Sequence, residues 1–135
     1  MNIDDLKKWP IEGKIAREKP VKLFHITKDK ILHTISGTKH PIHLSFYVSN
    51  DLINMGEFEI PSGGEGVRAS EPDIHKGDEA FYVLIGPIMV FLPDTQESFE
   101  VLEGECMFIP EGIKHQYLNY TDKVVKAVFA VAPDL

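Results

Sequence analysis

The sequence predicts an all-β protein, built as a sandwich or barrel of short strands. Three observations lead to this: about ten short runs rich in β-branched and aromatic residues, turn residues between them at close spacing, and almost no stretch with a helical period. The chain has 135 residues, which suits one domain with a single closed or sandwiched core.

The elements follow one another with clear turn signals. Residues 3–9 favour a short helix that Pro10 ends, with Leu6 and Trp9 near one face. A Gly-rich loop at 61–66 and a Pro-Asp-Thr-Gln turn at 93–96 then separate apolar runs. The expected strands are, in order, residues 31–36, 42–49, 53–60, 67–75, 79–85, 88–92, 98–102, 106–109, 115–120 and 124–131.

Composition narrows the function classes. The formal net charge of −7 argues against a nucleic-acid-binding surface and against docking on an anionic membrane. No apolar run approaches the ~18 residues of a transmembrane helix, and the polar residues 1–8 lack the order of a secretory signal. Cys106 is the only cysteine, so no internal disulfide can form. We expect a soluble cytoplasmic protein.

Two segments carry the chemistry. Residues 73–86 read D-x-H-x3-E-x6-G, and residues 104–119 read G-x5-P-x-G-x2-H-x3-N. These segments resemble the paired signatures of the cupin superfamily, and the second matches at every fixed position. The first has Asp73 where the family usually has histidine. The resemblance covers about residues 50–132 and implies a jelly-roll β-barrel of two antiparallel sheets.

The resemblance also implies a metal site. Alternate side chains of a strand share a face, so Asp73 and His75 point together. By the family pattern they converge with Glu79 and His115 near one mouth of the barrel. Two histidines with two carboxylates form a hard ligand set that favours Fe2+ or Mn2+, with Zn2+ or Ni2+ as alternatives. Two other interpretations stay open: a site of three ligands without Asp73, and a cupin that holds no metal.

Other residues are candidates for the pocket around this site. Tyr117 shares the parity of His115 on its strand, so it should point into the pocket. We expect Glu79 and Tyr117 to be the catalytic residues that move a proton, and the alternative for Tyr117 is that it only lines the barrel. Arg68 is a candidate partner for a substrate carboxylate, although an outward-facing charge is the alternative. The expected pocket residues are Phe81, Val83, Phe129 and Arg68.

Several polar residues have a structural interpretation instead. We expect His40 and His43 to be surface histidines, with a pocket role for one of them as the alternative. Lys126 is expected to face outward, and Asn119 to cap a turn. Cys106 lies in an apolar strand and is predicted to be a buried small hydrophobe.

One cupin scaffold supports many chemistries, so the resemblance leaves the reaction open. The interpretation we adopt is a metal-dependent enzyme that performs a dioxygenase-type oxidation of a small hydroxy-, keto- or aromatic acid. The alternatives are a non-redox lyase, decarboxylase, isomerase or hydrolase, and a non-catalytic module that binds a small molecule. We divide the chain into an N-terminal arm, residues 1–30, and a cupin domain, residues 31–135. Because the arm is apolar, we expect a homodimer that pairs through the arm or through an outer sheet.

Overall fold

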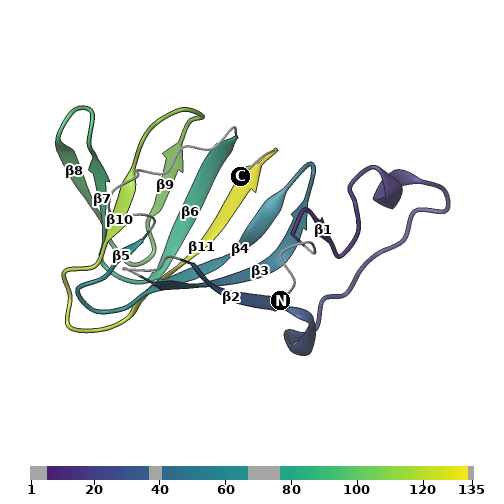
Figure 1. Ribbon diagram of the computed structural model, residues 1–135, viewed down its shortest axis with the longest axis horizontal. Helices are drawn as coiled ribbons and strands as arrows, with labels where there is room; N and C mark the ends of the chain where they lie inside the picture. The colour runs from purple at the N-terminus through teal and green to yellow at the C-terminus, as the bar shows by residue number, and fades with distance from the viewer. Residues whose placement is uncertain (1–5, 37–40, 67–76, 134–135) are drawn as a thin grey trace.

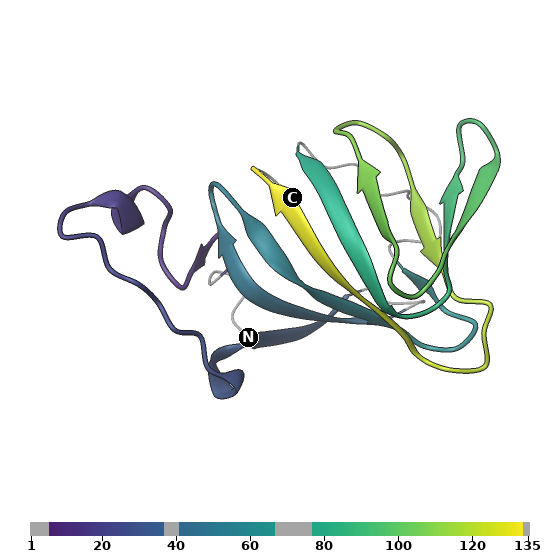
Figure 2. The same cartoon turned by 180° about the vertical axis from the view of Figure 1, so that it is seen from behind.

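The computed structural model describes residues 6–36, 41–66 and 77–133. These residues form two antiparallel sheets (Figures 1 and 2). The large sheet contains β1 (Lys8–Trp9), β2 (Leu32–Ser36), β3 (Ile42–Asn50), β4 (Asn54–Ile60), β6 (Asp78–Ile85), β9 (Cys106–Ile109) and β11 (Val125–Ala132). The small sheet contains β5 (Glu65–Gly66), β7 (Ile88–Leu92), β8 (Glu97–Val101) and β10 (Gln116–Leu118).

Strand order gives the jelly-roll arrangement. The large sheet runs β1-β3-β4-β11-β6-β9, with β2 also beside β3, and the small sheet runs β5-β10-β7-β8. In both views the large sheet crosses the molecule and the small sheet lies at one side of it. The all-β jelly-roll prediction is confirmed, and each expected strand within the described ranges is present to within a few residues.

The core fills the space between the two sheets. Strands β4, β6 and β11 alternate buried and more exposed residues, as expected of strands with one face on the core. Their inward side chains include Phe58, Phe81 and Phe129, whose rings pack within 6.2 Å of one another or of Tyr117. Burying one such ring contributes about 2–3 kcal/mol, so these aromatic side chains are a main source of stability.

The N-terminal segment differs from the prediction. Of the helix expected over residues 3–9, the described part is no helix: Lys8 and Trp9 form β1 and pair with Asn50 and Ser49. A helix of so few residues forms too few hydrogen bonds to offset the free-energy cost of nucleation. Pairing with β3 instead gives the backbone hydrogen-bonding partners on an existing sheet. Residues 1–5 lie outside the described residues.

Between β1 and β2 the chain makes a long excursion. Residues 10–31 contain only two single-turn 3-10 helices, η2 (Ile15–Arg17) and η3 (Lys28–Lys30). This arm projects beyond the edge of the large sheet (Figure 1). No helix within the described ranges has the length and hydropathy that crossing a bilayer requires.

Candidate metal and catalytic site

Three of the predicted site residues meet between the two sheets. Glu79 lies near the start of β6 in the large sheet, His115 directly precedes β10 in the small sheet, and Tyr117 lies on β10. Their relative exposures are 4%, 0% and 2%, so all three are buried. Polar groups at this depth interact strongly because little water screens them.

Their contacts link the three side chains. The Tyr117 hydroxyl donates a 2.6 Å hydrogen bond to Glu79 Oε1. The other carboxylate oxygen, Glu79 Oε2, lies 3.5 Å from His115 Nε2. His115 Nδ1 lies 2.8 Å from the carbonyl oxygen of Ile113. Because a carbonyl can only accept, Nδ1 carries the hydrogen in this bond, and Nε2 is the nitrogen directed at Glu79.

The turn before β10 brings His115 to Glu79. Gly112 has φ of +85°, in the left-handed region that glycine adopts without strain. Next to it, the Glu111 backbone N–H donates a 3.0 Å hydrogen bond to Asp78 Oδ1. This contact ties the turn to the first residue of β6, beside Glu79. The turn at Gly112 and its hydrogen bond to Asp78 therefore hold His115 close to Glu79.

Glu79 and His115 have the geometry of two ligands of one metal ion. With metal–ligand bonds of about 2.1 Å, donors 3.5 Å apart subtend an angle of about 110° at the ion. The Nδ1 hydrogen bond of His115 is the second contact that a metal-binding histidine ordinarily makes. Both side chains thus fit a divalent cation.

The other two predicted ligands, Asp73 and His75, lie outside the described residues, as do Arg68 and His40. Across residues 6–36, 41–66 and 77–133, no group of three or more His, Cys, Asp or Glu side chains is arranged to hold a metal. Glu79 and His115 are therefore the described part of the predicted ligand set.

Of the predicted pocket residues that the structure describes, Phe81 contacts Tyr117, whereas Val83 and Phe129 belong to the same buried core. Phe81, Val83 and Phe129 are buried, and the Phe81 ring meets the Tyr117 ring edge-on at 5.2 Å. Sequence reasoning missed Phe58, which stacks on Tyr117 with ring centroids 4.9 Å apart. Its alternation with Ile60 on β4 marks it as inward-facing, but only the packing of the two sheets places it against Tyr117.

Two residues predicted to face outward do so. His43 stacks on His33 with centroids 5.3 Å apart, and its Nδ1 lies 3.6 Å from Glu59 Oε2. Lys126 lies between Glu57 at 3.3 Å and Glu59 at 3.4 Å. Burial opposes the charged form of Lys126, but the two carboxylates outweigh it and raise the pKa of this amine.

Asn119 has the predicted structural role, whereas the prediction for Cys106 is wrong. The Asn119 side chain is buried and bonded to the turns around it. Cys106 is exposed. It pairs with Tyr82, whose side chain faces outward, and on β9 only Ile109 is fully buried. Because all four residues of β9 are apolar, the sequence cannot show which face turns inward.

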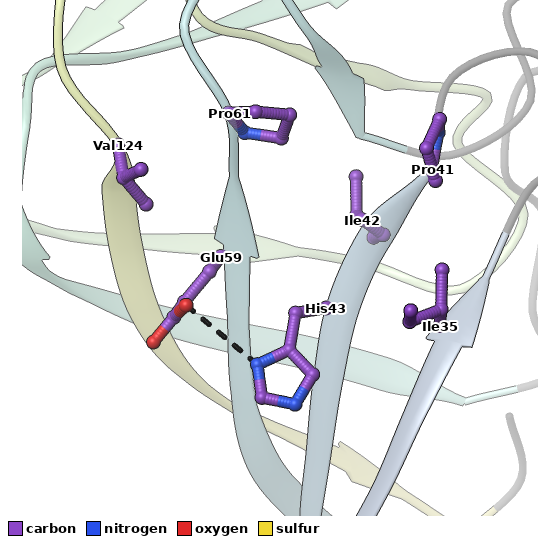
Figure 3. A pocket seen from close by; sticks show the side chains of 7 residues that line it. All are labelled: Ile35, Pro41, Ile42, His43, Glu59, Pro61 and Val124. Carbon is purple, nitrogen blue, oxygen red and sulfur yellow. Dashed lines mark ion pairs between the residues drawn. The ribbon is translucent and has the colours of Figure 1, made fainter.

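A separate hollow lies at the ends of β2, β3 and β4 (Figure 3). It has a volume of about 260 Å³, and the His43–Glu59 ion pair forms its polar wall. The remaining lining is apolar: Ile35, Pro41, Ile42, Pro61 and Val124. This hollow does not include Glu79, His115 or Tyr117, so it is distinct from the candidate metal and catalytic site.

Comparison with known proteins agrees with this architecture. The Cupin domain family matches residues 56–131. No curated protein matches the chain. A polyketide cyclase, RemF from Streptomyces resistomycificus, is 23% identical with a TM-score of 0.61, covering 82% of this chain and 78% of its own.

Two further structures are similar. A sugar phosphate isomerase of the cupin superfamily from Silicibacter pomeroyi is 18% identical with a TM-score of 0.63, covering 81% of this chain and 75% of its own. The iron(II) form of HppE is 14% identical with a TM-score of 0.69, covering 81% of this chain and 60% of its own. At these identities the similarity shows the fold alone.

Proposed function

Because the chain belongs to the cupin family, we propose that it is a metal-dependent enzyme that oxidises a small hydroxy-, keto- or aromatic acid in a dioxygenase-type reaction. The observation that carries the proposal is the buried contact of Glu79 with both His115 and Tyr117. Buried ionisable groups in contact with one another are typical of active sites.

The proposed ion is Fe2+ or Mn2+, held by His75, Glu79 and His115 with Asp73 as fourth ligand. Such a mixed nitrogen and oxygen set is hard enough for these ions and leaves positions for a substrate. The iron(II) form of the structurally similar HppE supports iron as a candidate. When bound, the ion would supply Lewis acidity and, as iron, redox chemistry with O2.

The chain's own residues orient groups and handle the proton. The Tyr117 hydroxyl holds Glu79 Oε1 at 2.6 Å, and this leaves Oε2 directed at His115. In our proposal Tyr117 Oη takes a proton from the substrate while it passes its own proton to Glu79 Oε1, so the phenol stays neutral and Glu79 holds the proton until it is returned. The rings of Phe58 and Phe81 against Tyr117 exclude water and receive the apolar body of the substrate.

The second candidate is a non-redox enzyme, such as a lyase, decarboxylase, isomerase or hydrolase. The Tyr117–Glu79 hydrogen bond favours it, because a paired phenol and carboxylate can move a proton without O2. The polyketide cyclase and sugar phosphate isomerase among the similar structures support this class as well. Tight binding of a metabolite without turnover would identify the third class, a non-catalytic binding module.

Metal analysis tests the site first. His115→Ala and Glu79→Gln should each lower the metal content of protein purified without added metal. The reason is that losing one ligand weakens metal affinity by roughly 10-fold or more. His43→Ala is the matched control, since it removes an imidazole from the outer face and should leave the metal content unchanged. Full metal content in both site variants would show that these side chains do not hold the ion.

Turnover then separates the reaction classes. Loss of substrate is measured over a set of small hydroxy-, keto- and aromatic acids with and without O2, and oxygen consumption is followed in the aerobic samples. Tyr117→Phe should keep the metal and lose most of the turnover, because the phenyl ring preserves the packing but carries no proton. Turnover that is unchanged under strict anaerobiosis would exclude the dioxygenase-type reaction and support the non-redox class.

A further inference from the structure

The buried polar side chains on the inner face of the large sheet, Ser49, Asn54 and Glu79, share one row. Directly paired residues of neighbouring strands lie on the same face, so the strand register defines this row. From one edge of the sheet to the other it consists of Trp9, Ser49, Asn54, Val131, Glu79 and Ile109. The last five are at most 4% exposed. The row thus carries an indole, a hydroxyl and an amide beside the carboxylate that contacts His115.

The adjacent row on β3, β4, β11, β6 and β9 is apolar. It consists of Phe46, Gly56, Phe129, Phe81 and Met107. Burying a polar group costs free energy unless the group is hydrogen-bonded, so a core has no use for a polar row beside this one. The polar row therefore indicates a surface that meets a polar ligand, and it is the surface that carries Glu79.

The oxygen atoms of this row already have partners. Ser49 Oγ accepts a 2.9 Å hydrogen bond from the Lys7 backbone N–H and donates one of 2.8 Å to Asn54 Oδ1. Asn54 Nδ2, which has two hydrogens, makes a long contact of 3.4 Å with the carbonyl oxygen of Pro133. What the row offers to a ligand is therefore N–H donors.

The indole nitrogen of Trp9 is a buried donor without an acceptor. Trp9 Nε1 is shielded from solvent, and it has no hydrogen-bond partner in the described part of the chain. An indole N–H can only donate, and a buried donor that lacks an acceptor destabilises the folded state. Such a group in a native protein calls for an acceptor from outside the chain, either a water or a ligand.

The chain holds Trp9 in place at the edge of the large sheet. Trp9 pairs with Ser49 through β1, and Leu6, three residues earlier, packs against the core. Four strand spacings of about 4.8 Å separate β1 from β6, so Trp9 lies about 19 Å from Glu79 along the sheet (Figure 1). Both side chains project from the same face, which shortens the gap between their polar atoms. A molecule that contacts both is nevertheless longer than a two- or three-carbon acid.

The chemistry of the row selects a carbonyl oxygen as the acceptor. None of the six residues in the row is a cation, so a second carboxylate at Trp9 would be buried without a counter-charge there. A hydroxyl would bring a hydrogen that needs an acceptor of its own. A keto, ester or amide carbonyl only accepts, and it therefore matches the lone donor of the indole.

We infer that Trp9 is a substrate-binding residue whose indole N–H donates a hydrogen bond to a carbonyl oxygen at the far end of an extended acid. The acid group of that molecule lies at Glu79 and His115, so the inference rests on the proposed function and narrows its substrate class. The substrate is an extended acid with a second, neutral carbonyl group, and Trp9 selects it against acids of the same length that lack this group.

The indole N–H itself provides a direct test, because Trp9 is the only tryptophan of the chain and gives a single indole resonance in a proton–nitrogen correlation spectrum. Full-length protein loaded with diamagnetic Zn2+ is titrated with α-keto acids of increasing chain length, each with and without a ketone near its far end. At the length that reaches Trp9, the acid with the far ketone should move the indole proton downfield. It should also bind about 3- to 10-fold more tightly than its partner acid, which is the contribution of one neutral hydrogen bond.

A substitution gives the second arm of the test. Trp9→Phe keeps an aromatic ring without the N–H, so the two acids of each pair should bind to it equally. Tyr120→Phe is the matched control, since it removes a polar group from an aromatic side chain that is 76% exposed, and it should keep both the preference and the shift of the resonance. The wild-type resonance needs no substitution, so it decides the question even if Trp9→Phe does not fold.

The outcomes separate this inference from the proposed reaction. Equal binding of the paired acids at every chain length, with the indole resonance unmoved, would overturn the inference and show that this N–H holds only solvent. Turnover of acids with no preference for the far ketone in kcat/KM would likewise overturn it, while the enzyme proposal would stand. A resonance that the far ketone moves in a protein that turns over none of the acids would support Trp9 as a binding residue and remove the proposed reaction.

Discussion

Replacing Asn119 should cost more stability than replacing any surface residue, because this one side chain joins two segments that are far apart in the sequence. Its Nδ2 donates to the carbonyl oxygens of Ile60 at 2.9 Å, Pro61 at 3.1 Å and Lys123 at 2.7 Å. Its Oδ1 accepts from the backbone N–H and the hydroxyl of Thr121, at 2.9 and 2.7 Å. The end of β4 and the turn between β10 and β11 are thereby fastened together.

The expected cost of Asn119→Ala follows from these contacts. Each hydrogen bond contributes about 1 kcal/mol net, and the amide group has two hydrogens to share among three carbonyls. With two accepted bonds, roughly four interactions are lost, and Asn119 is fully buried. Several of the partner groups are partly exposed and can bind water instead. We therefore expect a loss of about 3 kcal/mol, against about 5–15 kcal/mol for a whole domain.

Urea denaturation followed by far-UV circular dichroism measures this loss as a lower midpoint at an unchanged slope. Asn119→Asp keeps the shape but directs a carboxylate oxygen at three carbonyl oxygens, so it should cost at least as much at neutral pH. Thr121→Val removes only one of these contacts, the hydroxyl that donates to Asn119 Oδ1, and should cost about 1 kcal/mol. A loss below about 1 kcal/mol for Asn119→Ala, or a stable Asn119→Asp, would refute the reasoning.

Two further predictions concern the large sheet. Gly56→Ala should destabilise the protein by about 3 kcal/mol or prevent folding, because its Cβ would overlap the carbonyl oxygen of Ser45. The control is Gly63→Ala in the loop after β4, where φ is +70° but the surrounding space is open, and it should cost about 1 kcal/mol. Thermal unfolding measures both losses of stability, and equal losses would contradict the overlap. Burial and then the Glu57 carboxylate raise the pKa of Tyr47, so the folded state keeps a proton that the unfolded state loses above about pH 10, and stability should fall as pH rises from there. Glu57→Gln should make that fall shallower in urea denaturation at pH 9, 10 and 11, and an unchanged slope would exclude the contact as a cause.

Much of the fold could be predicted because the core strands alternate clearly. On β11, Val125, Ala127 and Phe129 face the core while the residues between them are more exposed, and this period of two is visible in the sequence. The approach of Glu79 to His115 could be anticipated only through the family motifs, since 36 positions separate them in the chain. The alternation of residues within a strand cannot show that Glu79 on β6 lies beside His115, which precedes β10.

The failures have local physical causes. β1 forms because Lys8 and Trp9 find hydrogen-bonding partners on β3, and a strand of two residues is too short to show a pattern in the sequence. The exposure of Cys106 was missed because an uninterrupted apolar run has no period from which to assign its faces. In the same way, the stacking of Phe58 on Tyr117 depends on how two sheets pack, which no single segment encodes.

The shortness of β10 has a consequence for how long the contacts of the candidate site persist. This strand has three residues, and its neighbour β5 has two, yet it carries Tyr117 and directly follows His115. Short strands detach at a lower free energy than the whole domain unfolds. Transient detachment of β10 would separate these groups from Glu79 while the large sheet stays folded. Amide hydrogen exchange at Tyr117 therefore reports how long the site persists, independently of global melting.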